Sequence, residues 1–210
     1  MRAAMREVDA AIGALRAALE RSGAAARTDI VVVSDHGMAE VPDGQVVAVE
    51  DMVDPADAIE ISHGQVVGFR PRPGREAAAE RQLLGRHDHY TCWRRDALPA
   101  RWQYGRHPRV PPIVCQMDTG WDALPRERLA RRPAGRRGSH GFDPAEPSMR
   151  AIFIAHGPSF RRGFTLPPVD NVDVYPLLAR LLGLPPVGDD GDPAALLPAL
   201  RPEAARTPGH

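Results

Sequence analysis

An apolar run of β-branched residues ends directly at a carboxylate and an imidazole, and this junction constrains the fold more than any other stretch of the chain. The run covers residues 30–33, and Asp35, His36 and Gly37 follow after one serine. A run of this kind, bounded by polar residues, predicts a strand that is buried on both faces. Open α/β sheets place their sites just beyond the carboxyl ends of such strands. Asp35 and His36 are therefore candidate ligands of a metal ion, although the same pair could also fill a polar turn.

The pattern of the remaining chain favours an α/β fold. Apolar residues recur at spacings of three and four over residues 2–21, which predicts an amphipathic helix that ends before Gly23. We expect a less regular insert between roughly 40 and 125, and an irregular loop over residues 126–138. The predicted strands are 29–34, 45–49, 65–69, 89–93, 111–117 and 149–155, and the predicted further helices are 75–84 and 171–182.

The composition narrows the classes of protein to be considered. The chain has 210 residues, enough for one domain or two small ones, and 27 basic residues balance 27 acidic ones. The formal net charge of zero gives no reason to expect nucleic acid as a partner. We find no apolar run of about 18 residues that would predict a membrane span, and the N-terminal stretch is too charged for a signal peptide. Cys92 and Cys115 are too few for a disulfide scaffold, and whether they form a single bridge stays open.

A second position of the metal-ligand type precedes the last predicted strand. His140 stands between Ser139 and Gly141, shortly before the apolar run at 149–155. An imidazole between small residues can reach an ion while the backbone stays compact. Asp143 is expected to order this loop and is not itself a candidate ligand. Two such loops, each next to a strongly apolar strand, favour a metal site more than either does alone.

Several motifs in the same order resemble the nucleotide pyrophosphatase/phosphodiesterase family of the alkaline phosphatase superfamily. They are the stretches VSDHGM at 33–38, RWQYG at 101–105, GSHGFD at 138–143, MRAIFIAHGPSF at 149–160 and NVDVYPLL at 171–178. The resemblance extends over about the first 185 residues. It implies an alkaline-phosphatase-like α/β sheet flanked by helices, of which this chain holds the C-terminal portion only. We therefore expect a partial catalytic domain over residues 1–185, with the less regular insert inside it, and a Pro-rich tail over residues 186–210.

The resemblance also implies an activity and a metal site. Family members hydrolyse phosphodiester or pyrophosphate bonds of nucleotides and other small molecules at a two-zinc site. By motif match, Asp35 and His36 ligate the zinc that activates the nucleophile, and His140 ligates the other zinc, nearer the leaving group. The family's nucleophile and three further metal ligands have no counterpart in this chain. Ser34 and Ser139 match no family nucleophile, so no catalytic residue is assigned here.

Two alternatives follow from the missing residues. The chain could be a catalytically inactive fragment or pseudoenzyme that keeps the second half of the fold, or it could belong to another hydrolase branch of the superfamily, acting on phosphomonoesters, phosphonates or sulfate esters. The compartment and the oligomeric state stay open, because relatives are usually exported or membrane-anchored and this chain shows no signal. Without the first half of the sheet, apolar strand edges and helix faces should lie uncovered, and we expect the isolated chain to be unstable.

Overall fold

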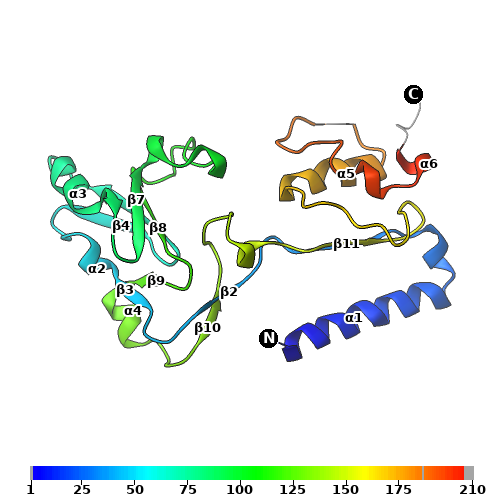
Figure 1. Cartoon of the computed structure of the whole chain (residues 1–210), viewed down its shortest axis with the longest axis horizontal. Helices are drawn as coiled ribbons and strands as arrows, with labels where there is room; N and C mark the ends of the chain where they lie inside the picture. Colours follow the sequence, from blue (N-terminus) through cyan, green and yellow to red (C-terminus); the bar gives the residue numbers. More distant parts are fainter. Residues whose placement is uncertain (1, 186, 206–210) are drawn as a thin grey trace. The chain divides into compact units, whose positions relative to one another are not determined.

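The protein is a mixed α/β structure built from two compact units, which confirms the predicted α/β class (Figure 1). The computed structural model describes residues 2–185 and 187–205. Unit 1 is formed by the described residues up to Asp35 and from Ala151 onward, and unit 2 is formed by His36–Arg150. The segment after residue 185 contributes to unit 1, because Leu196 and Leu200 are buried there beside Phe160.

Unit 1 contains a two-stranded antiparallel sheet, two longer helices and four shorter ones. Its elements are α1 (Arg2–Arg21), the 3-10 helix η1 (Ala24–Arg27), β1 (Ile30–Val33), β11 (Phe153–His156), η5 (Asn171–Asp173), α5 (Val174–Leu181), η6 (Leu197–Ala199) and α6 (Pro202–Ala205). Strand β1 pairs with β11. Since directly opposed residues point to the same face, Val31 and Ala155 lie together on one face and Val32 and Ile154 on the other.

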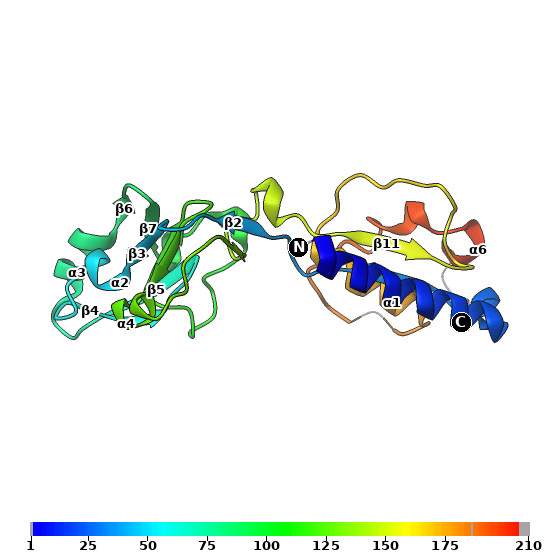
Figure 2. The same ribbon diagram turned by 90° about the horizontal axis from the view of Figure 1, so that it is seen from below.

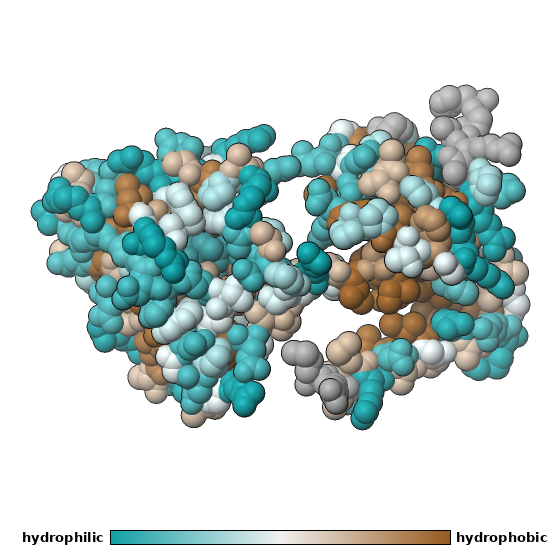
Figure 3. Space-filling model, in the orientation of Figure 1, coloured by the Kyte–Doolittle hydropathy of each residue, from teal (hydrophilic) through white to brown (hydrophobic). Residues whose placement is uncertain are grey.

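Neither strand of the β1–β11 sheet carries a fully buried residue. Val31, Phe153 and Ala155 contact the buried cluster of unit 1, whereas the side chain of Ile154 on the other face is 59% exposed. The prediction that this apolar run forms a strand buried on both faces is therefore wrong for the described residues. The run does form a strand, but Ile30, Val31 and Val32 are only half-buried and Val33 is 48% exposed. Figure 3 shows the resulting apolar surface of unit 1 in brown.

The amphipathic helix predicted over residues 2–21 is confirmed as α1, yet its apolar side chains find little to pack against. Val8 is 60% exposed and Leu15 is 51% exposed, and no described residue of α1 is buried. Figure 2 shows α1 running in the same general direction as β11. None of the described helices is both long and apolar enough to cross a membrane. The uncovered helix face predicted from the sequence is thus present in α1, whereas the expected instability stays a prediction.

Contiguous exposed apolar surface favours association, so we expect the chain to self-associate through the apolar side of unit 1 and Ile154→Thr to weaken this association. The substitution puts a hydroxyl on an exposed strand position of the apolar face, and threonine keeps the β-branched shape that strands favour. The free energy of unfolding should change by no more than about 0.5 kcal/mol, because the side chain is mostly in solvent. Sedimentation velocity over a concentration series measures the effect. Ile59→Thr, at an isoleucine of unit 2 that is 42% exposed, is the matched control, and an equal reduction in both variants would contradict the assignment.

Unit 2 carries most of the strands, so the segment expected to be less regular is an ordered unit. Its elements are β2 (Ala39–Val41), β3 (Val46–Ala48), α2 (Val49–Met52), β4 (Ala58–Ser62), β5 (Val66–Pro71), α3 (Glu76–Leu83), β6 (Gly85–Arg86), β7 (Tyr90–Arg94), η2 (Arg95–Ala97), η3 (Ala100–Trp102), β8 (Ile113–Met117), β9 (Asp122–Leu124), α4 (Arg126–Ala130), β10 (Arg137–Ser139) and η4 (Pro147–Met149).

A five-stranded antiparallel sheet in the order β4-β5-β8-β7-β6 forms the centre of unit 2. Alternate residues of its strands point to opposite faces. Val67, Cys115 and Cys92 oppose one another across β5, β8 and β7, and they belong to the main buried cluster with Leu83 of α3. One face of the sheet therefore packs against α3 and forms the core. The other face carries Gln116 and Trp93 and supports the loops described below.

Two predictions for unit 2 and its boundary need correction. Residues 126–138, expected to be an irregular loop, begin with helix α4 and end in strand β10. The strand expected over residues 149–155 starts later, because η4 occupies residues 147–149 and β11 begins at Phe153. Both short elements were missed because their sequences are rich in arginine and proline. Pro125 and Pro147 stand at the starts of α4 and η4, positions that tolerate proline because no helical N–H is needed there.

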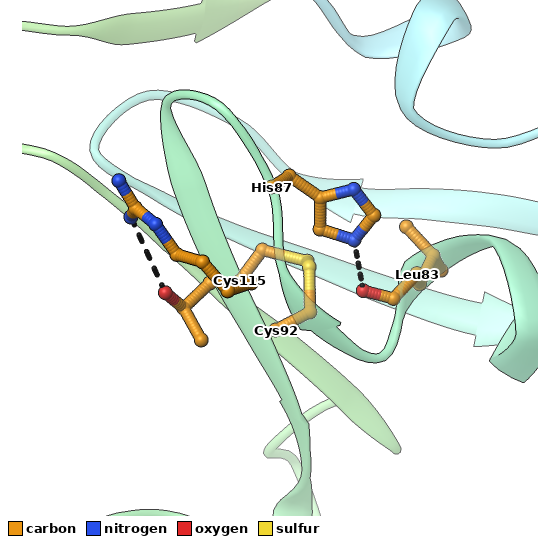
Figure 4. The surroundings of a disulfide bond; sticks show 6 residues. Leu83, His87, Cys92 and Cys115 are labelled. Atoms are coloured by element: carbon orange, nitrogen blue, oxygen red, sulfur yellow. Dashed lines mark hydrogen bonds between the residues drawn. A yellow bond between two sulfur atoms is a disulfide. The ribbon is translucent and has the colours of Figure 1, made fainter.

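Cys92 and Cys115 form a disulfide between the adjacent strands β7 and β8, which answers the question that composition left open (Figure 4). Backbone hydrogen bonds from Asp118 N to His89 O and from Arg95 N to Pro112 O flank the pair. Alternation along an antiparallel ladder then makes Cys92–Cys115 a non-hydrogen-bonded pair, the kind in which opposed side chains lie closest. Cys92 is 2% exposed and Cys115 is fully buried, so the bond lies inside the core.

The double variant C92A/C115A should unfold more easily than the parent. The cysteines are 23 residues apart in sequence, and closing a loop of that length in the unfolded chain is worth about 3 kcal/mol on the chain-entropy account. Urea unfolding followed by tryptophan fluorescence reports this loss, since Trp93, Trp102 and Trp121 all lie in unit 2. Reductant should destabilise the parent and leave the double variant unchanged; equal sensitivity of both would contradict the role assigned to the bond.

Candidate functional site

Two of the three candidate metal ligands lie together in unit 2. The imidazole rings of His36 and His140 are stacked, with their centroids 3.9 Å apart and their planes inclined by 14°. The residues are more than a hundred positions apart in the chain, so the fold and not sequence proximity brings them together. His36 is half-buried and His140 is exposed, which leaves the pair accessible from solvent.

The short ribbon of β2 and β10 explains why the two histidines meet. Strand β2 begins at Ala39, shortly after His36, and strand β10 ends at Ser139, directly before His140. The strands are antiparallel, and Ser139 pairs with Ala39. Antiparallel pairing places the start of one strand beside the end of the other, so both histidines emerge at the same end of the ribbon.

The backbone around His36 fixes the tautomer of its ring. Nδ1 lies 2.8 Å from the carbonyl oxygen of Gly37, and because a carbonyl only accepts, Nδ1 is the donor; in the neutral ring this assigns the lone pair to Nε2. Histidine ligands of metals commonly donate their second ring N–H to a backbone carbonyl in this way. Gly37 in turn is held by a hydrogen bond from its N–H to the carbonyl oxygen of Met149, 2.9 Å long.

A small buried cluster lies beneath the two loops. Ala39, Val41, Phe142 and Met149 pack together, and Val41 is fully buried. Phe142 comes two residues after His140, so burial of its ring anchors the loop that carries the second histidine. This arrangement ties both candidate ligands to one apolar support within unit 2.

Asp35, the third candidate, belongs to unit 1. It follows β1, and its carbonyl oxygen accepts a hydrogen bond of 3.0 Å from Nδ2 of Asn171. In the sequence it directly precedes His36. The structure therefore brings His36 and His140 together, and it describes Asp35 within the other unit.

Asp143 orders the His140 loop, as expected from the sequence. Its two carboxylate oxygens accept hydrogen bonds from the two Nη atoms of Arg101. Oδ1 also accepts a hydrogen bond of 2.9 Å from the backbone N–H of Ala145. The Arg101 guanidinium holds the pKa of the Asp143 carboxyl below its ordinary value, while partial burial acts in the opposite direction. The sequence reading did not find Arg101 as a neighbour of this loop. The only signal available was its place in the RWQYG motif, 42 residues before Asp143.

The histidine pair suits zinc by residue type and by the tautomer of His36, but it does not reach the number of ligands that zinc takes. Zinc sites usually have three or four protein ligands. Among residues 2–185 and 187–205, no group of three or more histidines, cysteines, aspartates or glutamates is placed to hold an ion.

The fold and the histidine pair define a mixed α/β protein with two loop histidines beside an antiparallel ribbon. A sequence profile of the type I phosphodiesterase / nucleotide pyrophosphatase family matches residues 1–143. The chain belongs to this family. The resemblance drawn from its motifs is therefore confirmed.

Individual relatives agree with this membership. Human ectonucleotide pyrophosphatase/phosphodiesterase family member 7 is 32% identical over 210 residues, and a bis(5'-adenosyl)-triphosphatase from Xenopus laevis is 27% identical over 184 residues. The matches cover 97% and 88% of this chain. They cover 45% and 39% of the relatives, so the chain spans less than half the length of either.

Solved structures show the same relation. Murine ectonucleotide pyrophosphatase / phosphodiesterase 5 superimposes with a TM-score of 0.84 at 31% identity, over 93% of this chain and 51% of that one. An inactive threonine-to-alanine form of the same murine protein, solved in complex with AMP, matches equally well, with a TM-score of 0.84. The agreement with about half of a larger chain supports the expectation that this sequence represents a portion of the family's α/β architecture.

We expect Gly37→Ala to disrupt the histidine pair. A Cβ at this position would lie 2.7 Å from the carbonyl oxygen of Arg150 and still closer to that of Ser148, so the backbone after His36 would have to move. Crowding of this kind costs about 1–3 kcal/mol. Thermal unfolding monitored by far-UV circular dichroism, which reports on the secondary structure of both units, measures the cost. Gly13→Ala, where an added Cβ meets nothing within 4 Å, is the control and should be neutral or stabilising.

Proposed function

We propose that this chain carries part of the two-zinc site of a phosphodiesterase or nucleotide pyrophosphatase. In this proposal Asp35 and His36 ligate one zinc and His140 ligates the other. The observation that carries it is the stacked pair of His36 and His140, formed by loops that the family's motifs mark. Membership of the type I phosphodiesterase / nucleotide pyrophosphatase family supports the same reading.

Residues of this chain would provide ligand atoms for the zinc ions, and neighbouring residues would orient these ligands. His36 presents Nε2 as its lone-pair nitrogen, because Nδ1 donates to the carbonyl of Gly37. Phe142 anchors the loop of His140 by burial in the apolar cluster, and Asp143 anchors it through its hydrogen bond with Arg101. When bound, paired zinc ions supply positive charge to the attacking and leaving oxygens of phosphoryl transfer. No nucleophile is assigned to this chain: Ser34 Oγ, the hydroxyl nearest to Asp35 in sequence, accepts a hydrogen bond of 3.0 Å from Ile152 N.

A small nucleotide with a phosphodiester or pyrophosphate bond is the substrate class that the proposal names. One relative is named for cleaving a bis(5'-adenosyl)-triphosphate, and a structural neighbour was solved with AMP. Both carry an adenosine 5'-phosphate group, so the shared chemistry is a phosphate ester on a nucleoside.

A non-catalytic role is the second candidate, and the ligand count favours it. Two histidines, with Asp35 as a third donor, are shared between two ions in the proposed site, and each ion needs further ligands beyond the described residues. A chain of this kind can keep the family's fold and its residual metal affinity without turnover.

The test measures zinc affinity by competition with a chromophoric chelator. His36→Ala and His140→Ala should each weaken zinc binding by about tenfold or more, since each removes one ligand. His107→Ala, at an exposed histidine of unit 2, is the matched control and should bind zinc as the parent does. Parent-like affinity in both of the first two variants would overturn the ligand assignment.

Hydrolysis of bis(p-nitrophenyl) phosphate with added zinc then separates the two candidates. Activity that Asp35→Ala abolishes supports the enzyme. Zinc binding without turnover supports the non-catalytic role and contradicts the catalytic proposal.

A further inference from the structure

The loop of His140 depends on contacts outside itself to hold the ring in place. It leaves β10 at Ser139 and turns at Asp143, where Glu146 N donates to the Asp143 carbonyl over 2.9 Å. His140 and Gly141 are exposed, and Gly141 has a φ of +94°, a conformation that glycine adopts without strain. Phe142 is the buried residue of the turn. One buried ring fixes where the loop sits, but it leaves the direction of the preceding imidazole to other contacts.

Two long side chains tie this loop to the outer face of the five-stranded sheet. Gln116 of β8 donates from Nε2 to the carbonyl oxygen of Gly141, 3.1 Å away. Arg101 of η3 donates from both Nη atoms to the two carboxylate oxygens of Asp143. These hydrogen bonds hold Gly141 and Asp143, which follow His140 by one and three positions, so they constrain the same short stretch from two directions.

Arg101 is itself held by the sheet. Its neighbour Trp102 packs edge-on against Trp93 of β7, with ring centroids 5.2 Å apart and planes inclined by 84°. Trp93 and Gln116 lie on adjacent strands and point to the same face, opposite to the core. The backbone that carries Arg101 is therefore anchored to the sheet through the contact of Trp102 with Trp93.

We propose that Arg101 is a positioning residue, which acts through Asp143 to hold the His140 imidazole against that of His36. This inference rests on the proposed function and deepens it, because Arg101 would orient the histidine pair of the proposed site. Arg101 does not contact the rings. It fixes the backbone from which one of them projects.

The guanidinium group is needed for this role, and a positive charge alone is not sufficient. A planar fork makes two parallel hydrogen bonds to a carboxylate and so fixes its orientation, whereas an ammonium acts as a point charge on a flexible stem. The low pKa of Asp143 fits the same arrangement, because an ionised carboxylate offers both oxygens to the fork. Arg101→Lys should accordingly keep the ion pair but release the loop.

The experiment measures NMR signals of the two imidazole rings in the metal-free chain of 210 residues, with labelled histidines. Protons above the face of a stacked aromatic ring resonate upfield, so the ring C–H signals of His36 and His140 report the stack. Arg101→Gln, Arg101→Lys and Asp143→Asn should each lose the upfield shift of both rings, and Arg101→Gln/Asp143→Asn should lose no more than either single variant. Backbone amide signals of β7 and β8 confirm that unit 2 stays folded.

Arg94→Gln is the matched control. Arg94 makes the same kind of two-pronged contact, to Glu80 of α3, and it lies at the side of the sheet away from the His140 loop. This variant should keep the stacked shifts. Unchanged ring shifts in Arg101→Gln and Asp143→Asn would overturn the proposal, and so would an equal loss in Arg94→Gln, which would reveal general loosening of the unit. Because no metal is present, a failure of zinc binding in the test of the proposed function leaves this result intact.

Discussion

Strand β8 organises unit 2, because its alternate side chains meet two different requirements. Ile113, Cys115 and Met117 point into the core, where they pack with α3 and with the paired strands β5 and β7. Gln116 points to the other face and reaches the His140 loop. A one-residue slip of β8 would exchange these faces and place a polar amide in the core, so the hydrophobic pattern that fixes the register also fixes the position of the loop.

The elements with strong periodic patterns could be predicted from the sequence. The helix over residues 2–21, the strands around residues 66–71 and 113–117, and the helix near residues 76–83 all appear close to the expected positions. Short elements in arginine- and proline-rich stretches could not, because α4 and β10 span five and three residues and carry no apolar repeat. The extent of burial of β1 was overestimated for a different reason. An apolar run shows that a strand is suited to a buried position, but it does not show which packing partners are present in the chain.

The sequence singled out His36 and His140, but it could not predict that their rings are stacked. Motifs identified His36 and His140 as chemically meaningful, but only the pairing of Ser139 with Ala39 explains why the rings meet. Arg101 and Gln116 escaped notice because arginine and glutamine are common surface residues and their partners are distant in sequence. Contacts that orient a site through a second residue leave no local pattern, so they are found by following hydrogen bonds outward from the ligands.

The disulfide between Cys92 and Cys115 has a consequence for how the motions of unit 2 could be followed. Both sulfur atoms belong to residues enclosed by the core beneath α3, so a reductant can attack the bond only when the sheet or the helix opens. The reduction rate of the native protein would then count those openings, and thiol labelling would record each one permanently. The chain thus contains its own chemical reporter of local unfolding, and one of its two cysteines, Cys115, directly precedes Gln116, whose side chain reaches the His140 loop.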